Sequence, residues 1–180
     1  IDEIEILDVG EEIEEKIPII NIIEYLQECD VIFPVLHGRY GEDGTIQGML
    51  ELLKKPYVGC KVLSSSLGMD KAYAKVIFDK ANIAQVNYVY IKREKENYTY
   101  VDKNFDEYEC NINKLIELIE KEISYPMFVK PSNSGSSLGI KRADCKEELI
   151  EAIEYASEVD SKILIEEEIK GREVECAVLG

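Results

Sequence analysis

The sequence is poor in positive charge and holds a single histidine. Lysine and arginine together number 21 against 37 aspartates and glutamates, which gives a formal net charge of −16. A surface of that sign repels phosphate backbones, so we expect no nucleic-acid partner. Any phosphate site must therefore be a local concentration of positive charge.

Paired cysteines and long apolar runs are also lacking. The five cysteines are scattered, odd in number and without a CxxC pair, which is typical of reduced thiols in a cytosolic protein. No apolar run approaches the ~20 residues of a membrane span, and no signal peptide is visible. The hydrophobic content of 46% supports a packed core rather than a disordered acidic chain. We expect a cytoplasmic protein without a membrane partner.

The first third of the sequence alternates helix and strand patterns. It opens on "IDEIEILDVGEE" without a starting methionine, so we expect the natural chain to begin upstream. The apolar run at 31–36 predicts a strand buried on both faces, although Pro34 disfavours it. Helical spacing marks residues 19–26 and 46–53, and a short strand follows at 56–59. This order predicts an open, doubly wound α/β domain over residues 1–62.

The remainder reads as an α+β lobe over residues 63–168, with a boundary at the serine run 64–66. The expected helices span 69–81, 112–123 and 149–156, and the expected strands span 86–93, 97–101, 127–130, 138–142 and 162–169. The strands at 86–93 and 97–101 should pair in antiparallel fashion. Residues 172–180 alternate like a further strand, so 169–180 is assigned to the start of another lobe.

The stretch "VKPSNSGSSLGI" at 129–140 places a lysine before a glycine- and serine-rich loop, the reverse of a Walker loop. Gly135, Ser136 and Ser137 could direct backbone N–H groups at an anion and close over a ligand. Lys130, at a strand end, could supply a point charge to a phosphate. The alternative is a solvated hairpin with a surface lysine.

Two lysines in "MDKAYAK" share one helical face, since Lys71 and Lys75 are four residues apart. A helix N-terminus repels cations, so Lys71 should have a further partner. The alternative is a simple ion pair with Asp70 or Asp79.

Three glutamates, 166–168, follow a buried strand and predict a connector that leaves the sheet. Its backbone could bond an adenine edge while a glutamate accepts from the exocyclic amine, and Glu173 could accept from ribose. The alternative is a solvated acidic edge.

The glycine-rich stretch "HGRYGEDGTIQG" at 37–48 places His37 at the end of the predicted strand, where open α/β sheets bind ligands. Its four glycines allow a close approach of backbone to ligand, and Glu42 lies within loop reach of His37. The alternative is a histidine that only caps a strand.

In this order the four stretches resemble the D-alanine–D-alanine ligase family of ATP-grasp enzymes. The resemblance rests on "HGRYGEDGTIQGMLELLKKPYVG", "SSSLGMDKAYAK", "FVKPSNSGSSLGI" and "ILIEEEIKGREVECAVLG". The sequence is also similar to the D-alanine–D-serine and D-alanine–D-lactate ligases of glycopeptide resistance. The resemblance implies the ATP-grasp fold, which is an α/β fold with an open α/β N-terminal domain. In this fold two α+β lobes hold ATP between them.

The resemblance also implies roles for individual residues. Lys71 and Lys130 would hold the α- and β-phosphates, and Ser137 would contact phosphate through its N–H. Glu166 would accept from the adenine amine, Glu167 and Ile169 would contact adenine through their backbone, and Glu173 would accept from ribose. Catalytic roles at D-alanine and the incoming amino group fall to His37, Glu42 and Ser136. The ATP-binding residues would be Lys71, Lys130, Ser136, Ser137, Glu166, Glu167, Ile169 and Glu173.

The implied reaction makes peptidoglycan precursors in two steps. A D-alanine carboxylate attacks the γ-phosphate of ATP, and the amine of a second D-alanine displaces phosphate from the acyl phosphate. The family's magnesium ligands and arginine lie beyond Gly180 and its glycine-rich strand lies upstream, so we expect this chain to hold no metal site and to be inactive alone. Glu168 replaces a residue that is often apolar in relatives, which would affect adenine packing.

Several alternatives stay open at this point. The second substrate could be D-serine or D-lactate instead of D-alanine, since the residues that choose it are expected outside this chain. A module of the same fold could bind nucleotide without catalysis, or the chain could be a non-enzymatic acidic domain. The resemblance also implies a homodimer.

Overall fold

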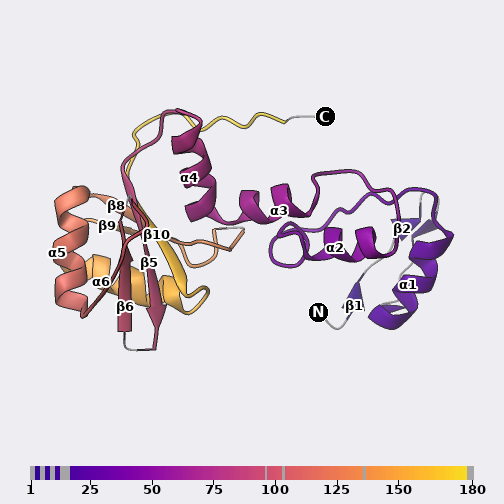
Figure 1. Ribbon diagram of the computed structural model, residues 1–180, viewed down its shortest axis with the longest axis horizontal. Helices are drawn as coiled ribbons and strands as arrows, with labels where there is room; N and C mark the ends of the chain where they lie inside the picture. The colour runs from indigo at the N-terminus through magenta and orange to yellow at the C-terminus, as the bar shows by residue number, and fades with distance from the viewer. Residues whose placement is uncertain are drawn as a thin grey trace. The chain divides into compact units, whose positions relative to one another are not determined.

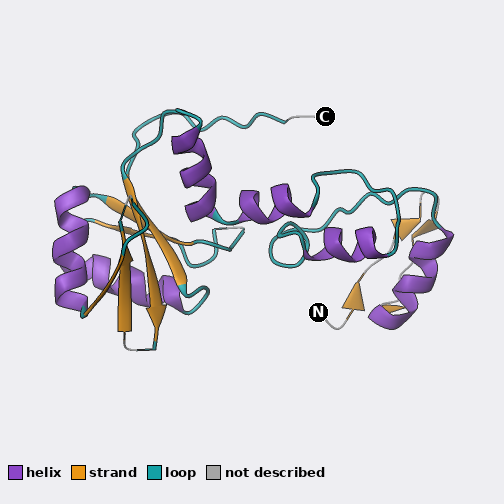
Figure 2. Cartoon of the chain, in the orientation of Figure 1, coloured by secondary structure: helices purple, strands orange, loops and turns teal. Residues whose placement is uncertain are grey.

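The computed structural model describes residues 3–4, 7–8, 11–12, 17–95, 97–102, 104–135 and 137–177, with side chains from residue 22 onward. The chain divides into two compact units, Ile1–Ser66 and Leu67–Gly180. Figure 1 follows the chain through both units, and Figure 2 distinguishes helices, strands and loops. Each unit is described by itself.

The first unit is built around two short helices, where the apolar spacing predicts them. They are α1 (Ile19–Glu28) and α2 (Thr45–Leu52). Two small antiparallel pairs, which the sequence did not indicate, precede α1. These pairs are β1 (Glu3–Ile4) with β4 (Ile17–Pro18) and β2 (Leu7–Asp8) with β3 (Glu11–Glu12).

The prediction of a buried strand at 31–36 is wrong. Sheet pairing there is limited to one isolated parallel bridge between Ile32 and Tyr57. The strand expected at 56–59 is likewise reduced to this bridge. The Ile32 amide donates to Pro56 O at 2.9 Å, and the Val58 amide donates to Ile32 O at 2.9 Å. The two segments run parallel at this bridge, as the α/β prediction expects, but they do not extend into paired strands.

The side chains of this segment explain the difference. Val31, Phe33 and Val35 are 59–71% exposed, so one side of the run has no covering element among the described residues. A continuous apolar run becomes a doubly buried strand only where neighbours pair with it and cover both faces. Pro34 also removes a backbone donor that pairing would use.

The second unit contains a six-stranded antiparallel sheet in the order β7-β6-β5-β10-β8-β9 (Figure 1). Adjacent residues of each strand alternate between its faces, as the period of two requires. The strands are β5 (Tyr88–Glu94), β6 (Asn97–Val101), β7 (Glu107–Cys110), β8 (Met127–Pro131), β9 (Lys141–Ala143) and β10 (Lys162–Glu167).

Helices α5 (Ile112–Glu122) and α6 (Lys146–Ser157) cover one face of this sheet and form the main core with it. Helix α5 starts where the Asn111 side chain caps the Lys114 amide. A second, smaller cluster lies on the opposite face, where Ala72 of helix α4 (Lys71–Lys80) packs against Tyr90 and Leu164.

The sequence predictions for this unit are mostly confirmed. The paired strands at 86–93 and 97–101 are β5 and β6, and a loop over residues 132–140 joins β8 to its antiparallel partner β9. The serine run expected as a boundary lies in helix α3 (Val62–Met69), and the division between the two units falls at the end of this run, between Ser66 and Leu67. Strand β7 was not predicted.

The strand expected at 172–180 is not formed at 172–177, and residues 178–180 lie outside the described part of the chain. A strand needs a partner for its backbone N–H and C=O groups, and no described segment pairs with this one. The domain limits proposed from the sequence, at 63 and 169, stay predictions.

The main core makes a direct prediction about stability. Leu149→Ala should lower the free energy of unfolding by about 2–5 kcal/mol, because Leu149 is fully buried in α6 and its truncation leaves a cavity. Leu138→Ala is the matched control, since Leu138 is 58% exposed and should change stability by less than about 0.5 kcal/mol. Urea denaturation of the 180-residue chain measures both, and equal effects would contradict the assigned core.

Candidate functional site

The N-terminus of α4 is fastened to the residues that follow β8. The Lys71 amide donates to Ser132 O at 3.0 Å, and the Ala72 amide donates to Ser132 Oγ at 3.1 Å. The Tyr73 amide donates to the Asp70 side chain at 3.1 Å, so Asp70 is the N-cap. The first three amides of the helix, which have no partner within it, are thereby all satisfied.

A buried charge network holds this junction together. Asp70 is 6% exposed, and its Oδ2 lies 2.7 Å from Lys162 Nζ on β10. Ser132 Oγ donates to Asp70 Oδ1 at 2.6 Å. Burial alone raises the pKa of Asp70, but hydrogen bonds from Lys162, Ser132 and the Tyr73 amide outweigh it and lower that pKa below its ordinary value.

The Lys71 ammonium group points into the loop after β8. Its Nζ donates to Ser134 O at 2.5 Å and lies 3.5 Å from Ser132 O. Burial, followed by the positive charge of Lys130, lowers the pKa of Lys71. Lys71 lies one helical turn before Lys75 on α4, and Lys75 shares Glu166 with Lys130, so the structure brings these lysines to one site. Among the described residues, neither Asp70 nor Asp79 pairs with the Lys71 ammonium group, which bonds backbone carbonyls instead.

Glu166 joins the two remaining lysines of this site. Lys130 Nζ bonds to Glu166 Oε1, and Lys75 Nζ lies 3.0 Å from Glu166 Oε2. Only 12% of the Glu166 side chain is exposed. Burial raises the pKa of Glu166, but the hydrogen bonds and charges of Lys130 and Lys75 outweigh burial and lower it.

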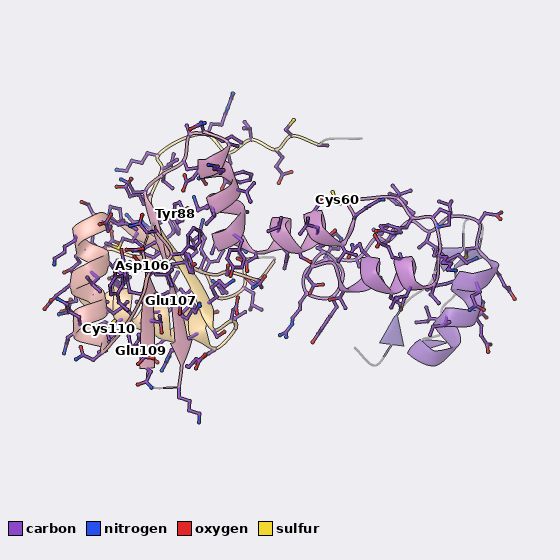
Figure 3. The ribbon with its side chains drawn as sticks, in the orientation of Figure 1. Cys60, Tyr88, Asp106, Glu107, Glu109 and Cys110 are labelled. Carbon is purple, nitrogen blue, oxygen red and sulfur yellow. The ribbon has the colours of Figure 1, made fainter. Side chains whose placement is uncertain are left out.

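Sequence reasoning noted Lys75 but gave it no role. Its Nζ lies 5.1 Å from the ring centre of Tyr88, which Figure 3 labels on β5, and Tyr88 pairs with Glu166 across the sheet. The four-residue spacing from Lys71 was the signal that could have identified it. We call Lys71, Lys75, Lys130 and Glu166 the lysine cluster.

The loop after β8 is ordered by its own hydrogen bonds where it is described. Ser134 Oγ donates to Leu138 O at 3.0 Å, and the Leu138 amide donates to Gly135 O at 3.1 Å. Ser137 is exposed, with a left-handed φ of 58°, and Ser136 lies outside the described residues. An ordered turn beside Lys71 argues against a simple solvated hairpin.

The connector after β10 is tied to the sheet at successive residues. The Glu167 amide donates to Asn87 O at 3.1 Å, which leaves the Glu167 carbonyl as its backbone group for a ligand. The Glu168 carboxylate accepts from Arg142 Nε at 2.8 Å. These pairings do not describe a solvated acidic edge. Ile169 is 70% exposed, and none of the described residues accepts its amide.

Two further glutamates of the connector, Glu168 and Glu173, differ in their surroundings. Glu173 is exposed, in a stretch without helix or strand. The Glu168 amide donates to Pro126 O at 3.2 Å, and its carboxylate is 18% exposed against Arg142. Arg142 therefore provides the charge partner that allows a glutamate at a position expected to be apolar.

In the first unit, residues 37–44 fold as a compact turn that leads into α2. Glu42 Oε2 accepts the Gly38 amide at 2.5 Å, and no described residue hydrogen-bonds to the His37 imidazole. Gly44 has a φ of 92°, and an added Cβ would lie 2.4 Å from Ser66 Oγ. An added Cβ at Gly41 would lie 2.5 Å from Leu36 Cβ. Packing therefore accounts for two of the glycines that the sequence suggested were there for a ligand.

The site's charge fits a polyphosphate better than a metal ion. Lys75 and Lys130 bond the Glu166 carboxylate, and Lys71 lies one helical turn from Lys75, so the lysine cluster holds three ammonium groups and one carboxylate in a chain of net charge −16. That is the local concentration of positive charge that the composition required. Within the described ranges, no group of three or more His, Cys, Asp or Glu side chains is placed to hold a metal ion.

The fold and its likeness to solved ligase structures define an ATP-grasp protein, with the lysine cluster on an antiparallel α+β lobe. The model for the "D-ala D-ala ligase C-terminus" matches residues 77–180, and the model for the "D-ala D-ala ligase N-terminus" matches residues 8–60. The chain belongs to the D-alanine–D-alanine ligase family.

Curated relatives agree with this assignment. The "D-alanine--D-alanine ligase" of Acetivibrio thermocellus is 55% identical over 157 residues, which are 87% of this chain and 39% of the relative. That of Prochlorococcus marinus is 47% identical over 93% of this chain and 44% of the relative. The chain therefore spans about two fifths of the length of these relatives.

Solved structures show the same likeness. The VanG D-Ala:D-Ser ligase of Enterococcus faecalis superposes with a TM-score of 0.66 at 42% identity, over 79% of this chain and 37% of that chain. The D-alanine–D-alanine ligase of Bacillus anthracis gives 0.64 at 34% identity, over 84% and 43%. No described helix is long and apolar enough to span a membrane, and all five cysteines are free thiols.

The buried network at Asp70 predicts a pH-dependent stability. Asp70→Asn should lower the free energy of unfolding at pH 7 by about 3 kcal/mol, because Lys162 loses its buried counter-charge. The folded-state pKa of Asp70 is lowered, so its stabilisation is complete above the unfolded value of about 3.9 and is lost as pH falls through the folded value. Urea titrations across this range should show the difference between variant and wild type shrinking on acidification.

Asp144→Asn is the control, because Asp144 pairs with Arg142 at an exposed position with 55% of its side chain accessible. Its effect should stay below about 1 kcal/mol at every pH. A loss at Asp70 that matches this control would show that the network does not hold the junction.

Proposed function

We propose that the protein containing this chain is an ATP-dependent ligase that joins D-alanine to a second D-alanine. The observation that carries the proposal is the lysine cluster, in which Lys75 of α4, one helical turn from Lys71, shares Glu166 with Lys130 of β8. Family membership and the 55% identity to a D-alanine–D-alanine ligase support it. The reaction would serve peptidoglycan synthesis in the cytoplasm.

The residues of the second unit would bind ATP, which supplies the phosphoryl group that makes a carboxylate a competent acyl donor. Lys71 and Lys130 would neutralise the phosphate charge, and Ser137 would add its amide. Glu166 would accept from the adenine amine. The remaining adenine and ribose contacts would come from the Glu167 carbonyl, the Ile169 amide and the Glu173 carboxylate.

The residues of the first unit would position substrate. His37, whose imidazole has no partner among the described residues, could bind the D-alanine carboxylate, while Glu42 orders the loop through the Gly38 amide. Ser136 would lie near the incoming amine. Alignment of this kind is the main protein contribution to a reaction between two bound molecules.

Magnesium belongs to the proposal through the family resemblance only. The described residues offer no cluster of metal ligands. A homodimer is likewise proposed from the resemblance.

A second candidate keeps the reaction and changes the acceptor. The 42% identity to the VanG D-Ala:D-Ser ligase favours D-serine as an acceptor to test, and D-lactate is the third. Either would connect the protein to vancomycin resistance. Product analysis with all three acceptors present would distinguish them, and ATP binding without any product would favour a non-catalytic module.

Lys130 provides the sharpest test of the nucleotide site. In a full-length enzyme that contains this sequence, Lys130→Met should weaken ATP binding by about 100-fold, because one charge-assisted phosphate contact is lost in a partly buried site. Isothermal titration calorimetry measures the dissociation constant directly. Lys141→Met, an exposed lysine on β9, should bind ATP like wild type. Unchanged affinity in the Lys130 variant would remove this residue from the site.

His37 tests the substrate assignment separately. His37→Ala in the full-length enzyme should raise the KM for D-alanine by about tenfold, because one hydrogen bond to a charged group is lost. The KM for ATP should change by less than about twofold, and steady-state kinetics with each substrate varied in turn measures both. An increase confined to the KM for ATP would contradict the role given to His37.

A further inference from the structure

The Glu166 carboxylate is held by two lysines at once, and this raises a question about nucleotide binding. Lys130 approaches Oε1 from the neighbouring strand β8, and Lys75 approaches Oε2 from helix α4 at 3.0 Å. The exposed fractions of the Lys75 and Glu166 side chains are 14% and 12%. The pair is therefore largely screened from water.

The proposed function requires Lys130 to leave this arrangement. An ammonium group that bonds a carboxylate at close range must release it, at least in part, to bond a phosphate oxygen. A nearly buried carboxylate that loses its only counter-charge is strongly destabilised. Binding of ATP would then be opposed by the isolation of Glu166.

Lys75 removes this obstacle. Its ammonium group already bonds the other carboxylate oxygen, and a carboxylate has enough lone pairs to accept from Lys75 and from a further donor together. The ring of Tyr88 beside Lys75 Nζ fixes the lysine from the side of β5. Lys75 can thus stay on Glu166 while Lys130 moves.

We propose that Lys75 is the permanent counter-ion of Glu166, which allows Lys130 to exchange from this carboxylate to the nucleotide phosphates. Lys75 is a positioning residue in this scheme, since it acts on the nucleotide through Glu166 and Lys130. The inference rests on the proposed function, because it takes ATP as the ligand.

A double-mutant cycle in the full-length enzyme tests the exchange. Lys75→Met should raise the ATP dissociation constant by about tenfold, because Lys130 then remains the only charge partner of Glu166. In a Glu166→Gln background the same substitution should change it by less than about twofold, since no charge is left to neutralise. Calorimetric titration of all four proteins with ATP provides the measurement, and Lys75→Arg should restore most of the affinity.

Controls separate the possible failures. Lys80→Met removes an exposed lysine from the same helix and should leave ATP affinity unchanged. If Lys75→Met weakens ATP binding equally with and without Glu166, Lys75 acts on the nucleotide directly or on the fold, and the exchange is wrong. It is also wrong if wild type binds ATP and Lys75→Met matches it. A wild-type enzyme that binds no ATP would instead overturn the proposed function.

Discussion

The junction between α4 and the end of β8 is the constraint on which the rest of the site depends. Ser132 accepts one helix amide with its carbonyl and another with its hydroxyl, and Asp70 caps the third. The ion pair of Asp70 with Lys162 then locks this corner to β10. Three elements distant in sequence are fixed at one point, so Lys71 and the loop that accepts its ammonium group have a defined geometry before any ligand binds.

Charge in the lysine cluster is arranged for binding an anion in a chain that is otherwise strongly acidic. Like charges at one site repel one another, and the pKa of Lys71 is lowered first by burial and then by the charge of Lys130. Glu166 reduces this repulsion by bonding two of them. The cluster is therefore stable without ligand and still carries excess positive charge. Electrostatic attraction of this kind acts locally, because salt screens the distant acidic surface within about 10 Å at ordinary ionic strength.

The helices and strands that could be predicted from the sequence are those that pack against other described elements of the chain. The core helices α5 and α6 and the strands β5, β6 and β8 follow their apolar periodicity, because the sheet and helices that bury them are encoded in the same stretch. Among the described residues, the run at 31–36 pairs only through the Ile32–Tyr57 bridge, and the run at 172–177 pairs with no strand. The roles of Lys75 and Lys162 were missed because their carboxylate partners lie far away in sequence, where periodicity carries no information.

The same junction explains why a lysine precedes the glycine- and serine-rich loop. In a Walker loop, free amides at a helix N-terminus bind phosphate, and the lysine adds to them. Here the amides of Lys71, Ala72 and Tyr73 are already bonded, so the start of α4 has no donors left for an anion. In the proposed function, phosphate charge would then be met by side chains. A lysine on a strand is held by its sheet neighbours on both sides, and Lys130 on β8, between β10 and β9, meets that requirement before the chain enters the loop.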